Sequence, residues 1–152
     1  MKFSTVEEFG IRCLVQIARE GEGGALTIPE ISHREGLSEA NVAKVLRLLR
    51  KEGFVLASRG KVGGYALTRP AEQIFVGEVV AALGGKLYDD EFCERHSGSS
   101  DVCLHEGACG IQALWEEVQE AIDRVLYRKT IAGLVGETLI RPEAIVRGAR
   151  RR

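Results

Sequence analysis

The sequence lacks any apolar run long enough to cross a membrane, which requires about 20 consecutive apolar residues. Its first segment, Met1 to Glu8, also lacks the apolar core of a secretory signal peptide. We therefore predict a cytoplasmic protein with no membrane partner. Disulfides are rare in that compartment.

Motifs of common enzyme classes are absent as well. The chain has no Walker phosphate-binding motif, no dinucleotide-binding fingerprint and no recognisable pair of nucleophile and base. The glycines within 60–64 follow a predicted strand but do not open a helix, as a phosphate-binding loop would. There is also no internal repeat or low-complexity segment. An enzyme is therefore not expected.

The formal net charge of −1 conceals an uneven distribution of charge. Residues 38–65 contain six Lys or Arg and only two acids, whereas residues 70–123 contain twelve acids and two basic residues. The first region suits a polyanion such as nucleic acid, and the second does not. The arginine-rich end, 147–152, is expected to be a solvated tail, or alternatively a weak phosphate contact.

Apolar periodicity predicts three helices in the first third of the chain. The first covers residues 3–20. The second begins after Thr27, with a glutamate three residues on that completes a capping box, and stops at Gly36. The third begins after Ser38 and ends at Gly53, and its apolar face consists of Val42, Val45, Leu46 and Leu49.

A β-hairpin is predicted directly after these helices. Residues 54–58 and 65–68 suit strands, and the glycine-rich segment 59–64 suits the loop between them. Two helices joined by a tight turn and followed by a hairpin form a winged helix-turn-helix. We therefore predict a mainly α fold with a small β-hairpin wing.

The rest of the chain predicts two helices separated by an irregular loop. Residues 74–84 form a short apolar helix, and residues 85–110 have no periodicity. Residues 111–129 show the longest helical pattern, with one apolar stripe of Ile111, Leu114, Val118, Ala121 and Val125. A stripe sustained over about three heptads favours packing on a second copy, although an ordinary core helix would look similar.

We accordingly divide the chain into four parts. We predict that residues 1–84 form a winged-helix DNA-binding domain and that residues 85–110 form a cluster-binding loop, because three of the four cysteines, the usual ligands of such clusters, lie in it. Residues 111–136 form a long C-terminal dimerisation helix with a short following segment, and residues 137–152 form a basic tail.

Polar residues on the third helix are candidates for DNA contact. In a helix-turn-helix, the start of the second helix enters the major groove. Asn41 can pair with adenine, and Lys44 and Arg47 can reach guanine or phosphate. Ser38 and the free N–H groups at the helix start can bind a phosphate. The alternative is that these are ordinary exposed polar residues.

The wing strengthens the DNA-binding prediction. Arg59 and Lys61 lie among glycines, including Gly63 and Gly64, which allow a tight turn and a close approach to another surface. An arginine at a wing tip can enter a minor groove. An exposed basic hairpin without a ligand is the alternative.

Three of the four cysteines lie in the irregular loop. Cys93, Cys103 and Cys109 are separated by nine and five residues, whereas Cys13 lies on the apolar stripe of the first helix and is expected in the core. Three thiols in a cytosolic loop favour an iron–sulfur cluster or zinc, centres that usually have four ligands. Zinc sites usually contain Cys-x2–4-Cys pairs, which are absent, so the wide gaps favour the larger cluster without excluding zinc. Candidates for the fourth ligand are His96, His105, Glu8 and Cys13.

Over residues 1–137 the chain resembles the Rrf-two family of winged-helix regulators, particularly its iron–sulfur sensors of the IscR and NsrR types. The resemblance is carried by the three-cysteine loop before a long helix and by four further segments: Leu37-Ser38, the wing from Arg59 to Tyr65, Val76 to Val80, and Thr130 to Val135.

The resemblance implies a homodimer that binds a palindromic operator in double-stranded DNA, usually as a repressor. It also implies a [2Fe–2S] or [4Fe–4S] cluster near the dimer interface, whose loss, oxidation or nitrosylation changes DNA affinity. Cys93, Cys103 and Cys109 match the family's ligand cysteines in order. The first gap exceeds the family's usual five residues, so either the loop bulges or one cysteine is not a ligand.

The resemblance also bears on the fourth ligand. Gln112 stands where IscR-type members have a histidine. NsrR-type members use an acid in the first helix, and Glu8 occupies the matching position here. Glu8, reaching the cluster of the other subunit, is thus the implied ligand, with His105 in reserve. A surface pair between Glu8 and Arg12 is the alternative.

The sequence therefore predicts a cluster-dependent DNA-binding regulator that senses redox state, nitric oxide or iron–sulfur status. One alternative keeps the DNA binding but replaces the cluster by structural zinc. The other is an adaptor without a cluster that binds a partner enzyme through the acidic middle of the chain.

Overall fold

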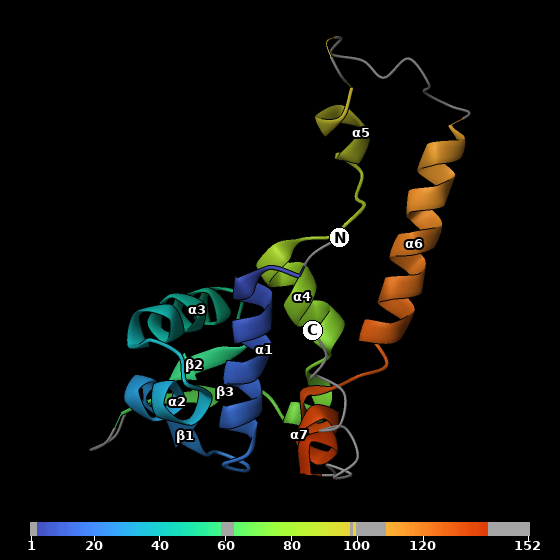
Figure 1. Cartoon of the computed structure of the whole chain (residues 1–152). Helices are drawn as coiled ribbons and strands as arrows, with labels where there is room; N and C mark the ends of the chain where they lie inside the picture. Colours follow the sequence, from blue (N-terminus) through green and yellow to red (C-terminus); the bar gives the residue numbers. More distant parts are fainter. Residues whose placement is uncertain (1–2, 59–62, 98, 100–108, 140–152) are drawn as a thin grey trace, which may run out of the picture.

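The computed structural model describes residues 3–58, 63–97, 99 and 109–139 (Figure 1). It confirms the predicted mainly α fold with a small β wing, and the predicted helices and strands lie within three residues of their expected bounds. The elements are, in order, α1 (Thr5–Ala18), β1 (Ala25–Leu26), α2 (Ile28–Glu35), α3 (Glu39–Lys51), β2 (Val55–Ala57), β3 (Tyr65–Leu67), the 3-10 turn η1 (Ala71–Gln73), α4 (Val76–Gly84), α5 (Phe92–Arg95), α6 (Gly110–Leu126) and α7 (Ile131–Leu139).

Local capping fixes the ends of the helix-turn-helix. Thr27 and Glu30 form the predicted capping box at the start of α2, and Gly36 ends α2 in the left-handed region with φ 65°. The Ser38 hydroxyl accepts a hydrogen bond from the backbone N–H of Asn41 at 3.3 Å and so caps α3. The turn between the two helices is therefore set by residues adjacent in the sequence.

The wing belongs to a three-stranded antiparallel sheet with strand order β1-β3-β2. The hairpin of β2 and β3 was predicted, and the backbone N–H of Ser58 closes it by donating to the Gly64 carbonyl at 2.8 Å. The sequence did not indicate β1, because two residues are too few to show strand periodicity. β1 lies against β3, with Leu26 opposite Tyr65.

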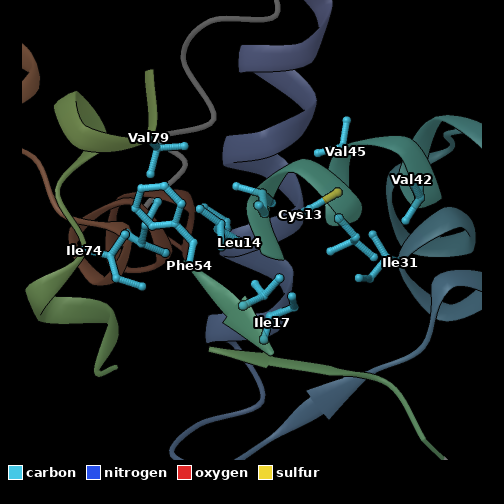
Figure 2. Close-up of a cluster of buried hydrophobic side chains, with 14 of the residues drawn as sticks. Cys13, Leu14, Ile17, Ile31, Val42, Val45, Phe54, Ile74 and Val79 are labelled. Atoms are coloured by element: carbon cyan, nitrogen blue, oxygen red, sulfur yellow. The ribbon is translucent and has the colours of Figure 1, made fainter. Parts of the chain in front are cut away.

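The core is built around α1, which packs against α3, α4 and α7 (Figure 1). Cys13, Leu14 and Ile17 on α1 are almost fully buried, and Figure 2 shows them among apolar side chains from the other elements. The predicted apolar face of α3 is buried in the same cluster. Burial of each large side chain stabilises the fold by about 1.5–3 kcal/mol.

The segment after α6 returns to this core. Ile131, the first residue of α7, is fully buried and donates its N–H to the Ile74 carbonyl at 2.9 Å. Phe75 and Thr130 form an isolated antiparallel bridge beside it. α6 therefore leaves the winged-helix domain, whereas α4 before it and α7 after it both pack on α1. In the part of the chain that the structure describes, none of these helices has the length and apolarity needed to span a membrane.

Candidate DNA-binding surface and cysteine site

The outer face of α3 is exposed and basic. Asn41, Lys44 and Arg47 are all exposed, whereas the opposite face of the helix is buried against α1. Ser38 is exposed at the N-terminus of α3, where the first backbone N–H groups of the helix point outward. The predicted polar residues thus share one accessible face, which a DNA groove can approach.

In the wing, the structure assigns different roles to the two glycines that it describes. Gly63 has φ 63° and meets no neighbouring atom, so its conformation alone favours glycine. At Gly64, a Cβ would lie 2.9 Å from the carbonyl carbon and oxygen of Leu26, so this glycine lets β1 pack against the hairpin. Arg59 and Lys61, the two predicted basic contacts, lie outside the described residues.

The cysteine site is described in part. Cys93 lies in α5 and Cys109 caps the start of α6, and both are free, half-buried thiols. Cys103 and the reserve ligand His105 lie outside the described residues. In the described part of the chain, which excludes these two, no three potential metal ligands gather at one point.

Aromatic contacts hold α5 beside α6. The ring of Phe92 lies 5.1 Å from that of Tyr88 and 6.3 Å from that of Trp115, measured between centroids. Burial raises the pKa of the Tyr88 hydroxyl, as do the nearby Cys93 and Glu116. Cys93 is thus next to the aromatic contacts that connect the two helices carrying the described thiols.

The Tyr88 hydroxyl interacts both with Cys93 and with the start of α6. A hydrogen bond with Gln112 lowers the pKa of Tyr88, and one with Cys93 raises it. Gln112 lies one helical turn after Cys109. Tyr88 therefore connects the residue before the described gap to the helix that begins after it.

Two other candidates for the fourth ligand have different environments. Cys13 is fully buried, and desolvation first and Glu35 second raise its thiol pKa to about 12 while Arg12 lowers it. This confirms its predicted place in the core. The imidazole Nδ1 of His96 lies 2.7 Å from the Phe92 carbonyl, and the His96 ring stacks on Phe92.

Glu8 is exposed on the first turn of α1. The possible surface pair with Arg12 is not the one that forms, because Arg12 binds Glu35 at the end of α2 through its Nε at 2.6 Å. In Figure 1, α5 and the first turn of α6 extend beyond the winged-helix domain that carries Glu8. Glu8 is therefore accessible to a group from outside its own domain.

α6 keeps most of its predicted apolar stripe accessible in the single chain. Ile111, Leu114 and Val125 are 62%, 52% and 61% exposed. Such large exposed fractions on one helix are typical of a surface that is covered in an assembly.

A helix-turn-helix with an exposed basic face, followed by a β wing, defines a winged-helix DNA-binding protein. Residues 3–137 match the model of the Rrf2 family, described as an iron-dependent transcriptional regulator. The chain belongs to this family. It is a transcriptional regulator and not an enzyme.

Individual relatives agree with this assignment. The chain is 33% identical to the protein rrf2 of Nitratidesulfovibrio vulgaris over 94% of this chain and 93% of that protein. It is 30% identical to the transcriptional regulator IscR of Cronobacter sakazakii over 89% of this chain and 80% of the relative. Its structure superposes on that of T. potens IscR with a TM-score of 0.71 and 28% identity, covering 91% of this chain and 88% of the other.

The sequence did not indicate two sets of contacts around the DNA-binding surface and the cysteine site. The partner of Arg12 and the contacts of Tyr88 both join segments far apart in the chain. Nothing in the periodicity of either segment indicates its partner, since periodicity identifies a buried face but not the element that covers it.

Proposed function

We propose that this regulator is an iron–sulfur-dependent repressor that senses redox state, nitric oxide or cluster status. The single observation that carries the proposal is the position of Cys93 in α5 and of Cys109 at the N-terminal cap of α6, two half-buried free thiols that flank the segment containing Cys103. Thiols on flanking helices fit the sulfur-rich ligand set of a cluster.

In this proposal Cys93, Cys103 and Cys109 hold the cluster, and Glu8 of the partner subunit supplies the fourth ligand. A bound cluster would supply iron that can change oxidation state or bind nitric oxide. The exposure of Glu8 and its lack of a pairing with Arg12 support the assignment. An oxygen ligand makes the centre more labile than four thiolates would, which suits a sensor.

DNA recognition is assigned to α3 and the wing. We propose that Asn41, Lys44 and Arg47 enter the major groove of each operator half-site, with Ser38 on a phosphate. The wing would follow the neighbouring DNA backbone or minor groove through Arg59, Lys61, Gly63 and Gly64. These four contacts are proposed from the sequence pattern. Because its ligand is chromosomal DNA, the protein would act in the cytoplasm.

The operator is proposed to be palindromic because the protein is proposed to be a homodimer. The exposed stripe of Ile111, Leu114 and Val125 on α6 would pack on the same stripe of a second copy. The dimer then fixes the separation of the two α3 helices, and a shift of that separation changes operator affinity.

The test is anaerobic purification followed by visible absorbance, iron and zinc analysis, and native mass spectrometry. A brown protein with stoichiometric iron and sulfide supports the proposal, whereas a colourless protein with stoichiometric zinc replaces the cluster by a structural metal. Operator binding without any added partner distinguishes both from an adaptor, which would need its partner enzyme.

The Glu8 assignment has its own test. Glu8→Ala should make the cluster unstable or alter its spectrum, and the matched exposed variant Glu72→Ala should not. An unchanged spectrum together with an unchanged DNA response would remove Glu8 from the ligand set.

A further inference from the structure

A cavity of about 290 Å³ lies between the start of α1, the end of α4 and the second half of α6. In Figure 1, α4 lies between α1 and α6. The walls of the cavity are apolar, with Val80, Ile122 and Leu126 among the lining residues, but charged groups also face it. Ligand pockets in proteins are usually built in this way, with a few polar groups in an apolar wall.

The first of these groups is Glu7, whose residue is only 7% exposed. One of its carboxylate oxygens, Oε2, accepts from the backbone N–H of Ser4, which completes the cap of α1. In the described part of the chain, no hydrogen bond or ion pair engages the other oxygen, Oε1. Because no enclosed side-chain oxygen in the described residues lacks a partner, Oε1 is open to the cavity, where it can accept from an additional donor.

A second negative group lies next to the Glu7 carboxylate. The Glu7 side chain lies against Gly84, where a Cβ would overlap the carboxylate. Gly84 is the last residue of α4, so the carboxylate sits at the negative end of that helix. Because both groups are electronegative, the ligand that fits here carries a positive charge.

A second carboxylate faces the cavity from α6. Gln119, which is 8% exposed, donates its Nε2 to Asp123 Oδ1 at 2.8 Å and accepts from the Tyr88 backbone N–H at 3.1 Å. These bonds hold Asp123 in place and leave its other oxygen without a bond to a described residue. Lys86, on the loop after α4, supplies a positive charge at the same cavity.

We propose that this cavity binds a small free amino acid. Its ammonium group would lie between Glu7 and Asp123, and its carboxylate would face Lys86. The cavity volume lies just below the range for ligand pockets, which is about 300–1,000 Å³, so a small side chain fits best. The bound molecule would touch α1, α4 and α6 at once and would fix α6 against the winged-helix domain.

This binding has a regulatory consequence that rests on the proposed function. If α6 carries the dimer contact, a ligand that fixes α6 also fixes the spacing of the two α3 helices. Binding at the cavity and affinity for operator DNA would then be coupled.

The test is isothermal titration calorimetry of the full chain with glycine, L-alanine, L-serine and L-cysteine. N-acetyl-L-alanine and L-alaninamide serve as matched probes, because each lacks one of the two charges. At least one free amino acid should bind, and its affinity should exceed that of both modified alanines. The inference is overturned if none of the four binds, or if the modified probes bind equally well.

Four single substitutions test whether the amino acid binds in this cavity. Glu7→Gln keeps the capping geometry, and Asp123→Asn keeps an acceptor for Gln119, so both should fold. Each should weaken binding on the order of tenfold, the effect of losing one charge-assisted hydrogen bond. Lys86→Ala should reduce the difference in binding affinity between L-alanine and L-alaninamide. The exposed variant Glu120→Gln, on the same helix as Asp123, should bind as the wild type does, and equal binding by all four variants would refute the site.

The same titration on Cys93→Ser separates this inference from the cluster. Loss of iron with retained amino-acid binding in this variant would support both the cavity and the proposed sensor, whereas a wild-type protein that binds an amino acid but carries no iron would support the cavity and contradict the sensor. A protein with iron that binds none of the four amino acids would support the proposed sensor and contradict the amino-acid site.

Discussion

Arg12 and Glu35 join α1 to the turn before α3. Arg12 donates from Nε to Glu35 Oε2 and from a terminal nitrogen to the Glu35 backbone carbonyl, both at 2.6 Å. Gln16, one turn further along α1, donates to the other carboxylate oxygen. Glu35 is the last residue of α2, so the interaction fastens the helix that carries Glu8 to the start of the recognition helix.

Breaking this contact should loosen the helix-turn-helix. Arg12→Ala leaves the Glu35 carboxylate, which is only 13% exposed, with fewer donors, and the free energy of unfolding should fall by about 1–2 kcal/mol. Urea unfolding measures the change. Arg34→Ala is the control, because its pair with Glu20 is more exposed and should contribute roughly 0–1 kcal/mol. Equal losses in both variants would show that α1 is not fastened in this way.

Asn41 should determine sequence preference on DNA. Asn41→Ala should weaken binding to the operator by about 1–3 kcal/mol and relax the preference at one base pair in each half-site. Lys44→Ala should instead weaken binding to all sequences and reduce the slope of affinity against salt by about one. Fluorescence anisotropy across operator variants and salt concentrations measures both. Gln73→Ala, an exposed change on η1, should leave binding unaltered, and a uniform loss in Asn41→Ala would assign that residue to phosphate.

Cys13 should make the protein less stable in alkali. Its thiol pKa is raised to about 12 by burial, so above its ordinary value of 9.0 the unfolded chain loses the proton while the folded chain keeps it. Stability is therefore full below pH 9 and falls as the pH rises from there, by about 1.4 kcal/mol per pH unit at most.

Urea unfolding under reducing conditions at pH 7.5 and pH 10 measures the loss. Cys13→Ala removes the titrating group and should show a smaller loss between the two pH values, although it is less stable at both. A loss of equal size in the variant would mean that other groups cause the alkaline instability.

Gly77 should be needed for the contact between α4 and the end of α6. A Cβ at this position would overlap the ring of Tyr127, so Gly77→Ala should destabilise the protein by about 1–3 kcal/mol. Tyr127→Ala removes the obstructing ring. The double variant should therefore be more stable than the sum of the two single changes predicts, and thermal unfolding of all four proteins measures this coupling. Strict additivity would show that the ring simply moves aside.

Much of the fold was accessible from the sequence because its signals are local. Thr27, Gly36 and Ser38 fix the ends of α2 and α3 through bonds to residues at most five positions away. The spacing of Val42, Val45, Leu46 and Leu49 identified the buried face of α3, and the structure confirms it. A cap or an apolar stripe acts over one or two helical turns, so it is visible without knowledge of the rest of the molecule.

Partners that lie far apart in the chain were not accessible. The sequence permitted Arg12 to pair with Glu8 on its own helix, but the packing of α1 against α2 gives it Glu35. Gly64 is a second residue whose contact could not be predicted from the sequence. Gly64 is predicted from the sequence to allow a tight turn and a close approach to another surface, and the structure shows that it also accommodates the Leu26 backbone of β1, a strand that the sequence did not indicate.

The sequence by itself determined the helix ends, the polar face of α3, the wing and the order of the cysteines, since each depends on neighbours within a few residues. Only the tertiary structure decided that α7 returns to α1, that Tyr88 connects Cys93 to α6, and that Glu7 and Asp123 face one cavity. Those relationships depend on how whole helices pack, and the packing of a helix is set jointly by every surface it meets.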